Sequence, residues 1–189
     1  MPSTVGLANL FADLARGLEG NRWCVMGAQA AILYGSTRMT LDVDISASIA
    51  DAERGLLLRR LGASGFSPRI GDALEFAQRT RVVLLIHSIT GVPVDLVLAG
   101  PGIEEEFLDR AHVLDIGGTR VPVLSPEDLI ASKLLAGRPN DLSDVASLLR
   151  RSELDLDRIR ELLRMFERAL DRSDLLVEFE RLAHAAHRT

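Results

Sequence analysis

The sequence predicts an α/β fold in which a mixed β-sheet is flanked by helices and followed by a helical C-terminal extension. Two observations lead to this expectation. Before residue 124, short segments with strand-like alternation of apolar residues are interspersed with segments of helical spacing. After residue 125, only helical patterns occur. We therefore expect a core over residues 1–124 and a C-terminal helical region over residues 125–189.

The expected core alternates between helices and strands. Apolar positions three and four residues apart indicate helices, whereas an every-second-residue pattern indicates strands. The expected helices span residues 4–19, 28–34, 51–61 and 103–111, and the expected strands span residues 22–26, 41–47, 66–70, 74–79, 81–88, 92–98, 112–116 and 119–123. The pairs Thr90-Gly91 and Gly117-Gly118 predict tight turns between neighbouring strands.

Ser125 is expected to begin the helical region. The run Ser-Pro-Glu-Asp is typical of a helix start, with a capping hydroxyl, a proline at the first helical position and acids in the first turn. The expected helices span residues 126–136, 141–150, 155–169 and 173–186. Asp155 and Asp157 lie at the start of the third of these helices, so we interpret them as structural.

Composition excludes several classes of protein. Of the 189 residues, 47% are hydrophobic, which is enough apolar surface to exclude disorder as the main state. The strongest apolar run, residues 82–86, has the length of a strand, so no membrane span is expected, and the N-terminus has no basic start typical of a signal peptide. The single cysteine, Cys24, excludes an internal disulfide and a cysteine-based zinc site, and favours a cytoplasmic location. The net charge of −5 argues against a broad nucleic-acid-coating surface but leaves room for a local basic patch.

Acidic residues interrupt two otherwise apolar segments. Asp42 and Asp44 point to the same face of one expected strand, and Asp95 interrupts the strand over residues 92–98. Neighbouring carboxylates repel, and a cation between them offsets that repulsion. Carboxylate oxygens suit Mg²⁺, and two such ions can hold the attacking and leaving oxygens of a phosphoryl or nucleotidyl transfer. The alternative is that these acids face solvent at strand ends or pair with Arg38.

Gly27 lies where a strand changes into a helix. Such a turn directs free backbone N–H groups at one spot, which can hold a triphosphate. The alternative is that the turn needs glycine only for its backbone conformation.

Lys133 is the sole lysine of the chain and lies near the end of an expected helix. Arg138 follows in the connecting turn, and Asp141 and Asp144 lie one turn apart on the next helix. Favourable charges at helix ends explain Lys133, Arg138 and Asp141 but leave Asp144 unexplained.

In this order, the motifs resemble the nucleotidyltransferase superfamily, whose fold is shared by DNA polymerase beta and kanamycin nucleotidyltransferase. The resemblance covers residues 20–150. It rests on the run from Val25 to Ala31, on Arg-x-Thr-x-Asp-x-Asp within residues 34–45, and on the strand over residues 92–98. The segment 126–149 resembles the AbiEii-like type IV toxins and related bacterial proteins.

The resemblance implies roles for individual residues. Asp42, Asp44 and Asp95 would be catalytic and would ligate two Mg²⁺ ions, and Asp95 would also help to deprotonate the acceptor hydroxyl. The implied nucleotide-binding residues are Gly27, Ala28, Gln29, Arg38, Lys133 and Asp144. Ala28 departs from the family pattern, which has serine or glycine at this position.

The implied activity is Mg²⁺-dependent transfer of a nucleotidyl group from a nucleoside triphosphate such as ATP to a hydroxyl of RNA (tRNA) or of a protein, with release of pyrophosphate. The toxin resemblance adds a cognate antitoxin as a partner. Two alternatives stay open. One is a catalytically silent nucleotide-binding or antitoxin-like interaction module of the same fold, and the other is a nucleotidyltransferase that modifies a small molecule.

Overall fold

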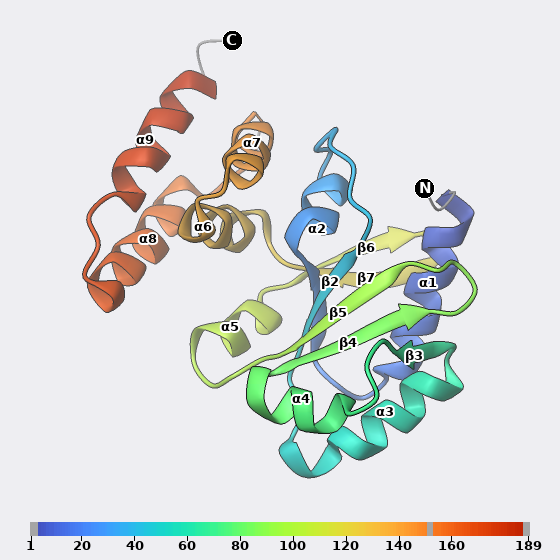
Figure 1. The fold of residues 1–189 in the computed structure, drawn as a ribbon. Coiled ribbons are helices and arrows are strands. Elements are labelled where there is room, and N and C mark those ends of the chain that lie inside the picture. Colours follow the sequence, from blue (N-terminus) through green and yellow to red (C-terminus); the bar gives the residue numbers. More distant parts are fainter. Residues whose placement is uncertain (1–3, 151–152, 187–189) are drawn as a thin grey trace. The chain divides into compact units, whose positions relative to one another are not determined.

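The computed structural model describes residues 4–150 and 153–186, and Figure 1 shows their helices and strands. Contacts divide the chain into two compact units. The sheet unit comprises residues 1–29 and 40–124, and the helical unit comprises residues 30–39 and 125–189. The short segment 30–39 therefore groups with the C-terminal helices, although it lies inside the first region of the sequence.

The described part of the sheet unit contains a seven-stranded mixed sheet with the strand order β3-β4-β5-β2-β1-β7-β6. Its strands are β1 (Trp23–Met26), β2 (Val43–Ala47), β3 (Phe66–Pro68), β4 (Val82–His87), β5 (Pro93–Leu98), β6 (His112–Ile116) and β7 (Thr119–Val123). β2 runs parallel to β5, and β1 runs parallel to β7, whereas the other neighbours are antiparallel. The structure thus confirms the predicted mixed sheet.

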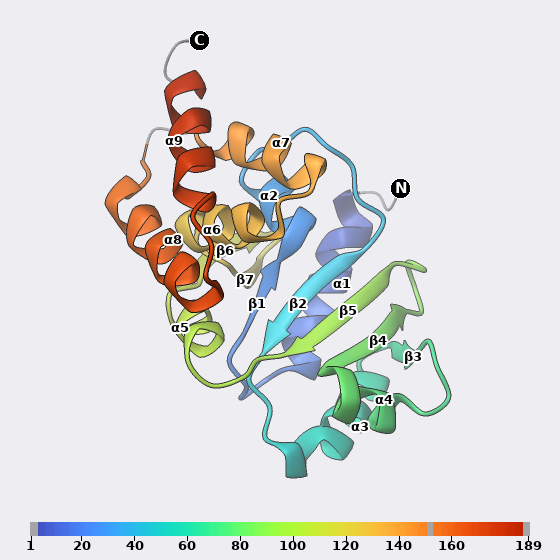
Figure 2. The ribbon, with the colours of Figure 1, turned by 60° about the vertical axis from the view of Figure 1, so that its left-hand side comes forward.

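Helices flank this sheet, as Figures 1 and 2 show. They are α1 (Thr4–Gly17), the 3₁₀ turn η1 (Asp51–Glu53), α3 (Arg54–Ala63), α4 (Ala73–Thr80) and α5 (Ile103–Asp109), and α2 (Gly27–Leu33) begins at the end of β1. Alternate residues of the central strands are buried, among them Ile45 of β2 and Leu96 of β5. Because strand residues alternate between faces, Asp44 and Asp95 lie on the opposite, partly exposed face.

Two expectations for the sheet unit are wrong. The predicted strand over residues 74–79 is the helix α4, in which Ala73 and Ala77, four residues apart, are both buried. The helix ends at Arg81, which adopts a left-handed conformation with φ 59°. The second correction concerns Asp42, which precedes β2 and does not lie within it.

The helical unit contains α6 (Pro126–Ala136), α7 (Pro139–Leu148), α8 (Leu156–Leu170) and α9 (Leu175–Ala186). α6 has the predicted bounds, and its predicted cap is confirmed, because the Ser125 hydroxyl accepts a hydrogen bond from the Asp128 amide at 3.2 Å. Asp155 caps α8 in the same way, through the Arg158 amide at 2.9 Å. Its structural interpretation is therefore confirmed.

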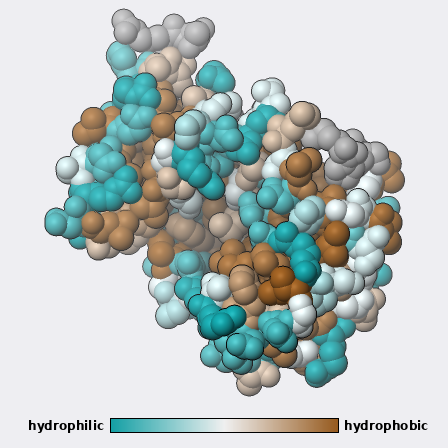
Figure 3. All heavy atoms as spheres, in the orientation of Figure 1, coloured by the Kyte–Doolittle hydropathy of each residue, from teal (hydrophilic) through white to brown (hydrophobic). Residues whose placement is uncertain are grey.

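Hydrophobic residues on the face shown in Figure 3 lie in small groups between hydrophilic ones. Large hydrophobic residues that are exposed include Val5, Met39, Leu41, Ile89 and Val177. Across residues 4–150 and 153–186, no helix is both long and apolar enough to span a membrane.

Candidate active site

Asp44 and Asp95 form the centre of the candidate site in the sheet unit. β2 and β5 are parallel neighbours, and their register places Asp44 directly opposite Asp95. Neighbouring strands are about 4.8 Å apart, so the two carboxylates lie side by side on one face of the sheet. The Asp95 side chain is 33% exposed, which leaves it open to solvent. Two adjacent like charges favour a nearby cation.

Gly27 lies against the Asp44 carboxylate. Antiparallel pairing of β1 with β2 sets Met26 opposite Asp44, and the chain then turns into α2 at Gly27 with φ +66°. An ideal Cβ at residue 27 would overlap the carboxylate, lying 2.8 Å from the Asp44 Cγ. Glycine thus meets two demands here, a left-handed backbone and the close approach of a carboxylate.

Asp42 lies at the edge of this site, on the residue just before β2, and is exposed. β2 starts after Asp42 because its pairing with β1 begins at Asp44 and its pairing with β5 begins at Val43. The Thr40 hydroxyl donates a hydrogen bond to the Asp42 Oδ1 at 2.5 Å. Thr40 therefore orients one of the three predicted carboxylates.

Arg69 joins the site although the sequence did not single it out. Its guanidinium donates to the Asp95 Oδ1, and both side chains are about one-third exposed. The partners are 26 residues apart, on the β3–α4 connection and on β5. A pair so distant in sequence leaves no local pattern, so nothing in the sequence could have revealed it.

Gln29 is the predicted nucleotide-binding residue with the most unusual environment. Its side chain is 4% exposed, and within the described part of the chain its Nε2 has no hydrogen-bond partner. A buried unpaired donor is costly and calls for a partner such as a bound water or ligand. Ala28, between Gly27 and Gln29, is half-buried.

Lys133 is the centre of a second cluster, which lies in the helical unit. Its side chain is 5% exposed, and its Nζ lies 2.7 Å from the Asp144 Oδ2 and 3.3 Å from the Asp141 Oδ1. Asp144 also accepts hydrogen bonds from the Ser36 Oγ and the Arg38 Nη1, both at 2.9 Å. These contacts account for the position of Asp144, which favourable charges at helix ends left unexplained. Asp144 connects the segment after α2 to α6 and α7.

Asp141 completes this cluster. Its carboxylate accepts hydrogen bonds from the Arg138 Nε at 2.6 Å and from Lys133. Burial by itself raises the pKa of Asp141, but the hydrogen bond from Arg138 and the nearby Lys133 charge outweigh it and hold the pKa below its ordinary 3.8. The cluster is therefore charged and internally paired.

The predicted site residues thus fall into two groups. Gly27, Asp44 and Asp95 come together in the sheet unit, with Asp42 beside them. Lys133, Asp144 and Arg38 come together in the helical unit. In the helical unit, Arg38 pairs with Asp144.

The chemistry of the donors fits a magnesium ion. Asp44 and Asp95 supply hard carboxylate oxygens on adjacent strands, with a third carboxylate at Asp42. In residues 4–150 and 153–186, no group of three or more His, Cys, Asp or Glu residues lies together in a way that could hold a metal ion. In this arrangement Asp95 is bonded to Arg69 and Asp42 to Thr40. The donor types fit, and side-chain rotation is needed for Asp42 to join Asp44 and Asp95 as a third ligand.

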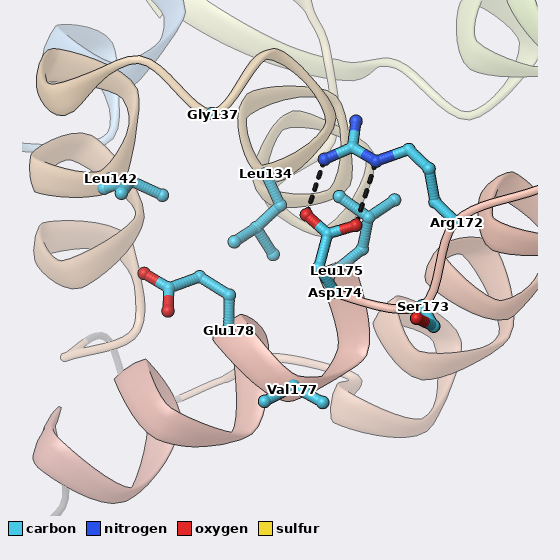
Figure 4. A pocket seen from close by; sticks show the side chains of 9 residues that line it. All are labelled: Leu134, Gly137, Leu142, Arg172, Ser173, Asp174, Leu175, Val177 and Glu178. Carbon is cyan, nitrogen blue, oxygen red and sulfur yellow. Dashed lines mark hydrogen bonds and ion pairs between the residues drawn. The ribbon is translucent and has the colours of Figure 1, made fainter. Parts of the chain in front are cut away.

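A separate hollow of about 530 Å³ lies within the helical unit (Figure 4). Leucines such as Leu134 and Leu142 contribute its apolar lining. Arg172 forms two hydrogen bonds to Asp174, at 2.7 and 3.0 Å, and also donates to the Leu135 carbonyl at 3.3 Å. The bonds to Asp174 lie within the α8–α9 turn, and the bond to Leu135 connects this turn to the end of α6.

The mixed sheet and its flanking helices have the nucleotidyltransferase fold. The sequence matches over residues 6–183 the DUF6036 family, described as a nucleotidyltransferase of unknown function, and the chain belongs to this family. No curated protein matches the sequence.

Solved structures with this fold resemble the chain over most of its length. An antigenic nucleotidyltransferase-like protein from Paracoccidioides brasiliensis is similar with a TM-score of 0.59, 18% identity and 92% of each chain covered. The antibiotic-resistance factor ANT(2'')-Ia is similar with a TM-score of 0.59, 14% identity, and coverage of 99% of this chain and 100% of that chain. JHP933 from Helicobacter pylori has a TM-score of 0.51 at 17% identity, with 97% of this chain and 90% of that chain covered. At these identities the likeness shows the fold alone.

Proposed function

We propose that this chain is a Mg²⁺-dependent nucleotidyltransferase that transfers a nucleotidyl group from a nucleoside triphosphate to a hydroxyl of RNA. The single observation that supports this most is the placement of Asp44 directly opposite Asp95, against Gly27. The family points to the same type of reaction. Side-by-side carboxylates next to a close-approach glycine suit a reaction in which a cation and a polyphosphate share one site.

Each residue of the site has a role in this proposal. Asp42, Asp44 and Asp95 hold the Mg²⁺ ions, which neutralise charge on the phosphates when bound. The oxygen of the acceptor hydroxyl forms a bond to the α-phosphorus of the nucleotide, and Asp95 takes the proton that this oxygen loses. The bond from the α-phosphorus to the bridging oxygen breaks, and pyrophosphate leaves. Gly27, Ala28 and Gln29 bind the nucleotide, and the buried Gln29 Nε2 is a donor available for it.

The other proposed nucleotide-binding residues belong to the helical unit and are Arg38, Lys133 and Asp144. Arg38, at 29% exposure, is the more open of the two cations that bond Asp144, whereas Lys133 and Asp144 are buried. Lys133 is engaged by two carboxylates, so in this proposal its contact with the nucleotide requires rearrangement within the cluster.

The proposed acceptor is a tRNA, and the proposed cellular role is that of a toxin controlled by a cognate antitoxin. Both rest on the resemblance of residues 126–149 to AbiEii-like toxins. A hydroxyl on a protein is the competing acceptor.

The test is incubation of the purified chain with each α-labelled nucleoside triphosphate, Mg²⁺, and either total RNA or total protein of a cell lysate. Asp44→Asn and Asp95→Asn are the test variants, and Asp51→Asn is the control because Asp51 is an exposed acid of the same unit. We expect label on RNA with the parent chain and the control, and at least a 100-fold loss with either test variant. Equal labelling by all variants contradicts the catalytic role of Asp44 and Asp95. Label on protein instead of RNA shows that the acceptor is a protein hydroxyl.

A second candidate is nucleotide binding without turnover. The departure at Ala28 and the engagement of Asp95 by Arg69 favour it. A melting temperature that rises with Mg²⁺ and nucleotide, together with no transfer to any acceptor, is its expected signature, because a ligand that binds only the folded state stabilises it.

A further inference from the structure

Arg69 lies in one row across the sheet with two of the candidate metal ligands, Asp95 and Asp44. The Arg69 backbone N–H donates to the Leu84 carbonyl at 2.9 Å. Leu84 of β4 lies opposite Asp95 of β5, and Asp95 lies opposite Asp44 of β2. The row therefore runs Arg69, Leu84, Asp95, Asp44. The backbone thus anchors Arg69 with one strand, β4, between it and the carboxylate that its side chain contacts.

The Arg69–Asp95 pair differs from the ordinary surface pairs of this chain. Arg79 and Glu75, for example, are four residues apart on one helix, 3.7 Å apart and about two-thirds exposed. Arg69 and Asp95 come from different elements, and each is only about one-third exposed. Screening by solvent is weaker for such a pair, so it contributes more than a typical surface pair.

Arg69 also contacts a carboxylate that a bound metal cation would use. Asp44 and Asp95 carry two negative charges on one face of the sheet, and the guanidinium supplies one positive charge at the Asp95 Oδ1. A divalent ion that uses both carboxylates needs oxygen lone pairs of Asp95. Arginine and metal therefore compete for the same carboxylate.

We propose that Arg69 is a positioning residue that competes with the divalent cation for Asp95. It offsets the charge of Asp95, one of the two carboxylates, when no metal is bound, and it releases Asp95 when the metal binds. Arg69 thereby raises the Mg²⁺ concentration at which the site fills. This inference rests on the metal site of the proposed function.

The experiment measures Mn²⁺ binding to the full chain without nucleotide, by the loss of the free-ion EPR signal. Arg69→Gln is the test variant. Arg79→Gln is the matched control, because it removes the same charge from the neighbouring helix α4. We expect Arg69→Gln to bind Mn²⁺ about fivefold more tightly than the parent chain, and Arg79→Gln to bind it unchanged. The Mn²⁺ affinity of Arg69→Lys should lie between those of the parent chain and Arg69→Gln, because an ammonium makes a weaker match to a carboxylate than a guanidinium.

Thermal unfolding gives a second measure that a merely structural role would not reproduce. In EDTA, Arg69→Gln should melt below the parent chain, because its two carboxylates lack a counter-charge. Saturating Mn²⁺ should remove that difference. A deficit that persists in saturating Mn²⁺ overturns the proposal.

Asp95→Asn separates this inference from the proposed function. In that background, Arg69→Gln should leave Mn²⁺ affinity unchanged, because the contested carboxylate is gone. If the parent chain binds Mn²⁺ through Asp95 and Arg69→Gln binds it no more tightly, the Arg69 proposal alone is overturned. If Mn²⁺ binding does not depend on Asp95 at all, the metal site of the proposed function is overturned together with it.

Discussion

Replacing Gly27 with alanine is expected to destabilise the protein in two separable ways. The first is the backbone, since φ +66° in the left-handed region costs alanine about 1 kcal/mol more than glycine. The second is the contact with Asp44, whose Cγ would lie 2.8 Å from the new Cβ. The carboxylate must then leave its rotamer, which costs about 1 kcal/mol more. Together these give a loss of about 2 kcal/mol in the free energy of unfolding.

Gly91→Ala isolates the backbone contribution. Gly91 has φ +68°, nearly the same conformation, and an ideal Cβ there would have no heavy atom within 4 Å apart from its chain neighbours. Urea denaturation should therefore show a loss of about 1 kcal/mol for Gly91→Ala, roughly half of that for Gly27→Ala. Asp44→Ala in the Gly27→Ala background should recover the excess, because the displaced side chain is removed.

Transfer activity is the second measurement on the same variants. Gly27→Ala displaces a proposed metal ligand, so its activity should fall by about 100-fold, whereas Gly91→Ala should stay near that of the parent chain. Equal destabilisation by the two alanines, with no coupling to Asp44, would refute the close approach of Gly27 to the carboxylate.

Three further predictions concern the helical unit. Lys133→Met should lower the free energy of unfolding by about 3 kcal/mol in urea denaturation, because it leaves Asp141 and Asp144 buried without their ammonium partner. The control is Arg181→Met, which removes a cation from an exposed pair and should cost less than about 1 kcal/mol in the same assay. Because the folded pKa of Asp141 lies below its unfolded value of 3.8, its contribution to stability is complete above pH 3.8 and is lost as the pH falls through the folded pKa. Asp141→Asn should remove that part of the acid dependence, and an unchanged pH profile would contradict the charged pair. Ser125→Ala should cost about 1 kcal/mol through the lost cap of α6, measurable as a lower urea midpoint.

Local sequence chemistry predicted the caps of α6 and α8, whereas α7 begins two residues before its expected start and α9 two residues after it. Ser125 followed by proline and two acids predicted the start of α6, because capping depends on residues within one turn of the helix. The same reasoning predicted the cap at Asp155. The strand predicted over residues 74–79 was wrong because so short a mixture of apolar and polar residues suits either a strand or a helix. Burial of Ala73 and Ala77 on one side decided for the helix α4.

The carboxylates of the candidate site were only partly predictable from the sequence. Alternation placed Asp44 and Asp95 each on a defined face of its own strand. Neighbouring positions of β2 and β5 brought these faces together, and that pairing depends on the order of strands across the whole sheet. Asp42 fell outside β2 because the adjacent strands stop pairing there.

By itself, the sequence determined the order of most helices and strands, the helix caps and the candidate carboxylates, because each depends on neighbours a few residues away. Only the tertiary structure decided which charges meet. Arg69 bonds Asp95 across 26 residues, His87 bonds Asp13 across 74, and Arg38 bonds Asp144 across 106. Any arginine can pair with any aspartate. The choice among them follows from packing and strand register, which no local pattern in the chain contains.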